Sequence, residues 1–170
     1  MQKRRVVGVS PLDAQHKKMK PPIMGGIQLK ANIRISRPPE VCYRYWRDFK
    51  NLSTILSHLD SVTVIDDRLS HWMVAAPADT SVEWDAEIIE DLPNERISWR
   101  SLQNAQIDNA GSVHFSPQEA GRQTELKVAL TYNPTLGIVG NGLAKLIGES
   151  PDQELADDLV RFKEAVEKGG

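Results

Sequence analysis

The chain has 170 residues, of which 40% are hydrophobic and 26% are charged, a composition typical of one soluble globular domain. It contains no run of about 18 apolar residues, which excludes a membrane-spanning helix. A single cysteine, Cys42, excludes an internal disulfide framework and a cysteine-rich metal site. The net charge of -2 argues against a dedicated nucleic-acid-binding protein. We expect a cytoplasmic protein that uses no cofactor.

The first 30 residues are strongly basic. They hold seven lysines and arginines and one acid, so this segment carries +6 and the remainder carries -8. Prolines and glycines interrupt the segment, and no apolar face recurs along it. We therefore expect residues 1–26 to form a flexible extension and residues 27–168 to form the folded domain. Weak contact with an anionic membrane surface and a targeting role are the two alternatives for this extension.

The folded part begins with a strand, because apolar and polar residues alternate over residues 27–36. Helical spacing of apolar residues predicts a helix over about 39–48, and a second short helix follows at 51–57. Further strands are expected, in chain order, near residues 61–65, 72–76, 82–88, 97–101, 111–116 and 126–132. The turns between consecutive strands are short, so the strands must be antiparallel.

A long amphipathic helix ends the chain. Leu155, Leu159, Phe162 and Val166 recur at helical spacing, and the opposite face is charged. Ser150 is the expected N-cap, and Pro151 and Gln153 complete a capping pattern. One face of the sheet is apolar, so this helix should cover it, giving an α+β fold.

The sequence gives little indication of a metal site or of a nucleophilic residue. The four histidines, His16, His58, His71 and His114, form no pair at helical metal-ligand spacing, so no metal site is expected. Of these, His58 is a weak candidate for a general base, since no orienting partner is visible. Cys42 is expected to be a small buried apolar residue. The acids at 83, 85 and 87 share one strand face, which is expected to face water.

Large aromatic residues occupy the apolar faces of five strands. They are Trp72, Trp84, Trp99, Phe115 and Tyr132. Such a set either fills a plain core or lines a cavity between sheet and helix, and the pattern alone leaves both interpretations open.

Several stretches together resemble one known family. They are 82–88 (VEWDAEI), 97–101 (ISWRS), 111–115 (GSVHF), 38–41 (PPEV), 45–49 (YWRDF), 132–134 (YNP), 148–151 (GESP) and 158–163 (DLVRFK). Residues 27–168 are similar to a bacterial subgroup of the polyketide cyclase/dehydrase proteins in the START-like superfamily, also called SRPBCC, Bet v 1-type or helix-grip. The sequence Asn133-Pro134-Thr135 departs slightly from that subgroup, which often has two prolines after an aspartate.

The resemblance implies a seven-stranded antiparallel sheet wrapped around a long C-terminal helix, with two short helices after the first strand and a hydrophobic cavity. Members bind lipids, sterols, quinones or polyketides, and a few are cyclases. They share no catalytic signature, so catalytic residues stay unknown, and the oligomeric state is not indicated.

Two classes of function therefore remain: binding or transport of a lipophilic small molecule, and a cyclase/dehydrase-type reaction in the same cavity. An enzyme needs polar groups converging inside, and the inward positions are nearly all apolar, with Tyr132 the main exception. Binding is favoured for that reason. The expected cavity residues are Trp72, Trp84, Ala86, Ile88, Trp99, Val113, Phe115, Val128, Leu130 and Tyr132.

Overall fold

A computed structural model describes residues 27–57, 59–76, 80–103, 105, 107–134 and 151–169. Three expectations fall outside these residues: the N-terminal extension over 1–26, the candidate base His58, and the helix cap at Ser150.

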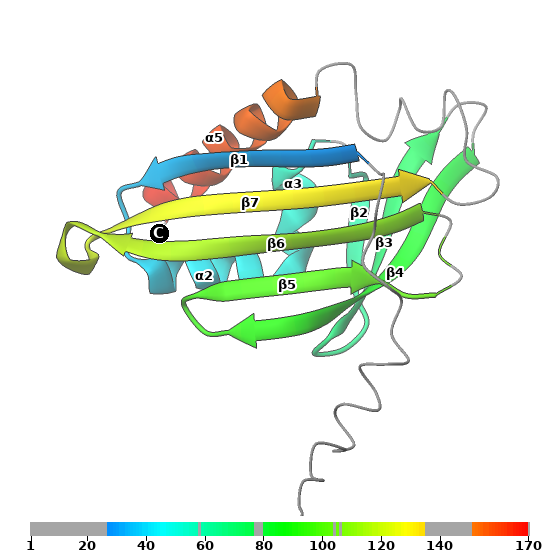
Figure 1. Cartoon of the computed structure of the whole chain (residues 1–170), viewed down its shortest axis with the longest axis horizontal. Coiled ribbons are helices and arrows are strands. Elements are labelled where there is room, and N and C mark those ends of the chain that lie inside the picture. The colour runs from blue at the N-terminus through cyan, green and yellow to red at the C-terminus, as the bar shows by residue number, and fades with distance from the viewer. Residues whose placement is uncertain are drawn as a thin grey trace, which may run out of the picture.

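The described chain forms one seven-stranded sheet in which every neighbouring pair of strands is antiparallel. The strand order is β1-β7-β6-β5-β4-β3-β2, so the first two strands of the sequence lie at opposite edges (Figure 1). The strands are β1 (Ile27–Ile35), β2 (Ser61–Val64), β3 (Leu69–Ala76), β4 (Thr80–Leu92), β5 (Arg96–Ser101), β6 (Ile107–Gln118) and β7 (Gln123–Pro134). The expected seven-stranded helix-grip sheet is confirmed.

The helices gather on one side of this sheet, whose facing surface is called the inner face below (Figure 1). Between β1 and β2 the chain crosses from edge to edge through α2 (Pro39–Arg47), the 3-10 turn η2 (Phe49–Asn51) and α3 (Leu52–Ile55). The long C-terminal helix is α5 (Pro151–Gly169). The expected helix at 39–48 is confirmed. The second helix, expected at 51–57, is shorter: α3 covers only Leu52–Ile55, and the 3-10 turn precedes it.

Alternation of buried and partly exposed side chains sets the inner face of the central strands. Along β6 every second residue from 107 to 115 is buried. This strand begins at Ile107, four residues before the predicted start. The prediction missed these residues because the inward positions 109 and 111 hold Asn and Gly, which interrupt the apolar alternation. The longer strand places Asn109 inside the molecule, 0% exposed.

The apolar side of α5 lies against the inner face. Its residues Leu155, Leu159, Phe162 and Val166 are each at most 3% exposed, as their spacing predicted. Phe162 makes edge-on ring contacts with Trp46 and Tyr45 of α2, with ring centroids 5.3 and 5.6 Å apart. The helix therefore closes a core that α2 and the sheet share.

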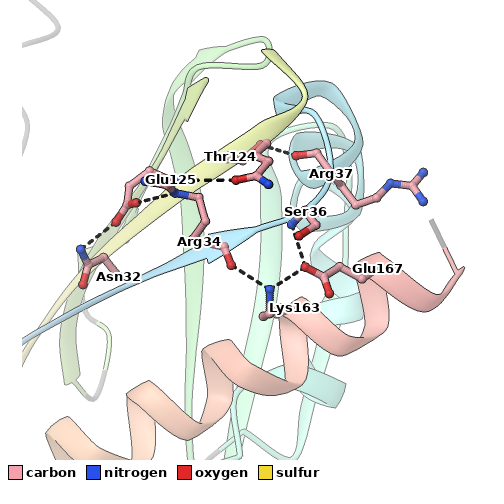
Figure 2. Close-up of polar contacts among 9 residues, drawn as sticks. Asn32, Arg34, Ser36, Arg37, Thr124, Glu125, Lys163 and Glu167 are labelled. Atoms are coloured by element: carbon pink, nitrogen blue, oxygen red, sulfur yellow. Dashed lines mark hydrogen bonds and ion pairs between the residues drawn. The ribbon is translucent and has the colours of Figure 1, made fainter. Parts of the chain in front are cut away.

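Polar contacts fix the C-terminal half of α5 beside β1 (Figure 2). The Lys163 ammonium donates to the Arg34 carbonyl oxygen at 2.9 Å and pairs with the Glu167 carboxylate at 2.6 Å. Glu167 also accepts the backbone N–H of Ser36 at 2.7 Å. Lys163 and this N–H both favour the ionised carboxylate and lower the pKa of Glu167.

We expect truncation of Phe162 to destabilise the fold severely. The Phe162→Ala change removes a fully buried ring and should lower the free energy of unfolding by about 3 to 5 kcal/mol. Chemical denaturation measures this loss. The matched control is Val160→Ala, two residues away on the same helix and 43% exposed, which should cost little. Equal effects of the two changes would contradict the packing described here.

Candidate functional site

All ten predicted cavity residues lie on the inner face of β3 to β7, and none is more than 3% exposed. The structure thus brings them together in one buried layer between the sheet and helices α2 and α5. Their role as ligand contacts stays a prediction.

The four tryptophans of the chain form one continuous cluster. Trp46 of α2 approaches Trp99 of β5 with ring centroids 6.2 Å apart. Trp99 stacks on Trp72 of β3 at 6.1 Å, and Trp72 approaches Trp84 of β4 at 5.8 Å. Phe49 of η2 meets both Trp72 and Trp99 edge-on. Three of these tryptophans come from the sheet, and Trp46 comes from the helical crossing on the opposite side.

The position of Trp99 depends on Gly111, its partner in the β5–β6 register. A Cβ atom at residue 111 would lie 2.3 Å from Cζ2 and 2.5 Å from Cε2 of the Trp99 indole. The Leu130 side chain, on the other flank, would be 2.9 Å away. The absence of a side chain at 111 therefore makes room for the indole on the sheet.

We predict that Gly111→Ala destabilises the protein by about 1 to 3 kcal/mol, the usual cost of inserting a methyl group into a packed core. Displacement of Trp99 should also change the near-ultraviolet circular dichroism spectrum. Gly169→Ala serves as the control, because nothing lies within 4 Å of a Cβ atom there. Unchanged stability and spectrum in Gly111→Ala would show that the indole does not depend on this glycine.

Several polar atoms in this layer have no partner among the described residues. The indole N–H groups of Trp46, Trp84 and Trp99 are buried and donate no hydrogen bond there, whereas Trp72 donates to the Ser70 hydroxyl at 2.8 Å. Most buried polar groups in proteins are paired. Leaving one unpaired costs about 1 to 3 kcal/mol. Three such donors therefore lie together in one aromatic cluster.

A second group of polar side chains lies at one end of the inner face. Asn109 and Tyr132 are register partners on β6 and β7 and are at most 1% exposed. The buried Ser101 hydroxyl, on β5, accepts the backbone N–H of Asn109 at 3.0 Å. Of this group, the sequence pattern indicated only Tyr132 as an inward polar residue. The alternation through residues 107–115 would have revealed Asn109, had it been extended past Gly111.

Asp158 contributes a buried carboxylate from α5. It pairs with Arg161 and accepts hydrogen bonds from Ser57, and Arg161 also donates to the Ile55 carbonyl oxygen at 3.3 Å. Burial raises the pKa of Asp158 to about 6, against the lowering effect of these partners. Burial, together with the negative charge of Asp158, raises the pKa of Tyr132. Sequence analysis missed Asp158, although it lies on the apolar stripe of the helix, three residues after Leu155.

Surface hollows lined by described residues lie on both sides of the sheet. One, of about 360 Å³, lies where α2 faces the β2–β3 turn and includes Tyr43, Arg47, Phe49, Leu69 and Ile88 in its lining. Its lining shares Ile88 with the predicted layer, and another lining residue, Phe49, contacts Trp72 and Trp99. The other, of about 320 Å³, lies on the outer face of the sheet and is lined by Lys30, Lys127 and His114 among others.

Cys42 lies in the core, and His71 lies on the outer face of the sheet. Cys42 is 0% exposed, as expected, and burial raises the pKa of its thiol. His71, which the sequence did not single out, lies between two acids on the outer face. Its Nδ1 is 2.7 Å from Asp85 Oδ1 and its Nε2 is 2.7 Å from Glu83 Oε1. Both acids thus face away from the core, as predicted, and they raise the pKa of His71.

The contacts of His71 with Glu83 and Asp85 should make a contribution to stability that falls as the pH rises. The folded pKa of His71 is above its unfolded value, about 6.5, so protonated His71 stabilises the fold fully below that pH. The stabilisation is lost as the pH rises through the folded pKa. Because the three side chains are 38 to 45% exposed, solvent screens these interactions and we expect only a small effect. Denaturation at several pH values should show the difference between wild type and His71→Gln shrinking toward alkaline pH. A constant difference would contradict this.

The fold and the buried layer together define a helix-grip protein. The family model described as polyketide cyclase/dehydrase and lipid transport matches residues 35–160. The chain belongs to this family.

Solved structures that are similar to this chain include three bacterial proteins. DR_A0006 from Deinococcus radiodurans is 41% identical, with a TM-score of 0.70 over 85% of this chain and 99% of that one. TTHA0849 from Thermus thermophilus is 25% identical, with a TM-score of 0.66 and the same coverage. A START superfamily protein from Mycobacterium smegmatis is 16% identical, with a TM-score of 0.62 over 84% and 99% of the two chains. None of the described helices is long and apolar enough to cross a bilayer.

Proposed function

We propose that this protein binds or carries a lipophilic small molecule between the inner face of the sheet and α5. The observation that carries the proposal is the set of three buried indole N–H groups, on Trp46, Trp84 and Trp99, with no acceptor among the described residues. A core that served packing alone would gain by pairing such donors. A flat or elongated apolar ligand with oxygen atoms would supply both the apolar contact and the missing acceptors. Quinones, lipids and polyketide-like compounds fit this description.

The alternative is a cyclase/dehydrase-type reaction on an aromatic or polyketide substrate in the same space. The observation in its favour is the buried Asp158 carboxylate beside Tyr132. Catalysis needs a group free to exchange protons with the substrate. Asp158 is already engaged by Arg161 and Ser57, so the carrier function is the better supported of the two.

The test begins with the natively purified protein. Mass spectrometry of its organic extract should reveal a bound apolar compound. Decylubiquinone, oleate and an anthraquinone should then be titrated against the intrinsic tryptophan fluorescence. At least one should bind saturably with a micromolar dissociation constant, about -8 kcal/mol. At about 25 cal/mol per Å² this requires burying roughly 300 Å² of apolar surface before the costs of association are counted. Absence of any saturable binding or bound compound would refute the proposal.

Variants of β4 locate the binding. Ala86→Arg places a bulky unpaired charge on the inner face, where Ala86 is 1% exposed, and should abolish binding. Asp85→Ala, on the opposite face of the same strand, should leave binding intact. Trp84→Phe removes one N–H donor but keeps an aromatic ring, so it should weaken binding while the apolar packing of the layer is retained. Circular dichroism shows whether each variant folds. Binding lost in Asp85→Ala but retained in folded Trp84→Phe would place the ligand elsewhere.

A further inference from the structure

The orientation of the Asn109 amide is fixed by its surroundings. Its Nδ2 donates to the Thr131 carbonyl oxygen at 3.3 Å. A carbonyl oxygen only accepts hydrogen bonds, so the amide nitrogen must be on that side and Oδ1 on the other. Oδ1 is buried and accepts no hydrogen bond among the described residues. Asn109 is held from the backbone as well, by the Ser101 hydroxyl.

The Tyr132 hydroxyl is the other polar group beside the Asn109 amide. Their hydrogen bond acts against the rise in the pKa of Tyr132, as expected when the amide N–H donates to the phenol oxygen, and it leaves Oδ1 facing the apolar layer. Asn109 lies directly across the β6–β7 ladder from Tyr132, and such opposite side chains have Cβ atoms about 5 Å apart. Gly111 and Val113 follow Asn109 along the inner face of β6, and Leu130 precedes Tyr132 on β7. One end of the inner face is therefore polar and the rest is apolar.

We propose that the ligand is a hydroxylated apolar compound whose hydroxyl group donates a hydrogen bond to Asn109 Oδ1, while its apolar body lies along the tryptophan layer. This inference rests on the proposed function and adds the chemical class of the ligand. An amide oxygen accepts and never donates. A compound that offers only acceptors at this end, such as an ether, leaves Oδ1 unpaired. A site built around a buried acceptor strongly rejects analogues that lack the donor.

The test compares two probes of nearly equal shape, 2-naphthol and 2-methoxynaphthalene. The ether is the more apolar, so area burial alone favours it. Isothermal titration calorimetry on the full chain should nevertheless show 2-naphthol binding at least about tenfold more tightly, which corresponds to about 1.4 kcal/mol. In Asn109→Leu, which replaces the amide by methyl groups of similar volume, the ratio should fall to one or below, with the affinity for the ether nearly unchanged.

Asn32→Leu is the matched control. Asn32 lies on the outer face, where it donates to Glu125 at 2.8 Å (Figure 2), and the same substitution there should keep the wild-type ratio. If Asn109→Leu fails to fold, Asn109→Ala removes the same acceptor without adding bulk.

The possible results of these titrations separate the hydroxyl assignment from the proposed function. A wild-type ratio near one, with both probes bound, overturns the hydroxyl assignment and leaves the proposed function standing. A tenfold preference that persists in the Asn109 variants shows that another group accepts the hydroxyl, which also overturns the assignment. If neither these probes nor the quinone, oleate and anthraquinone bind, the proposed function fails and this inference fails with it.

Discussion

Trp99 can lie against the sheet only because residue 111 has no side chain. From that position the indole touches Trp46 of α2, Phe49 of η2 and Trp72 of β3. Trp99 thus contacts both α2 and η2 of the crossing segment, beside the contacts of Phe49 with Trp72 and of Tyr43 with Phe115. Phe162 of α5 packs on Trp46, so the C-terminal helix, which also lies directly beside β1, is linked to the same cluster. A methyl group at residue 111 would displace the Trp99 indole and so disturb its contacts with α2, η2 and β3.

The polar atoms inside this apolar layer oppose folding. Unpaired indole N–H groups, an amide oxygen and a carboxylate buried on α5 all lower stability relative to apolar residues of similar size. Functional sites commonly show such local conflicts, whereas cores selected for stability avoid them. On the inner face these atoms gather in one aromatic layer, whereas on the outer face of β3 and β4 the acids meet His71 near solvent. This contrast supports the proposal that the ligand binds on the inner face.

The fold was largely readable from the sequence because its strands alternate strictly. Trp84, Ala86 and Ile88 on β4 were assigned to the correct face by period two alone, and α5 was recognised from the spacing of Leu155 to Val166. The polar half of the candidate site was missed for a specific reason. Asn109 and Asp158 occupy inward positions of otherwise apolar patterns, and a search for apolar residues passes over them. The pairing of His71 with acids twelve and fourteen residues away depends on the β3–β4 register, which the sequence does not fix.

The placement of β1 and β2 at opposite edges has a consequence for how the chain folds. β1 is the first strand, yet its ladder partner is β7, and Asn32 meets Glu125 across 93 residues of sequence. The contact between Ser36 and Glu167 spans 131 residues. Such non-local pairings make folding slow, because the entropy of closing a long loop is lost before the contacts form. During synthesis the edge of β1 stays unpaired until β7 has left the ribosome, and the tryptophan layer stays uncovered until α5 follows. The nascent chain therefore exposes the apolar inner face until residues 151–169 have been made, and this is the interval in which chaperones act.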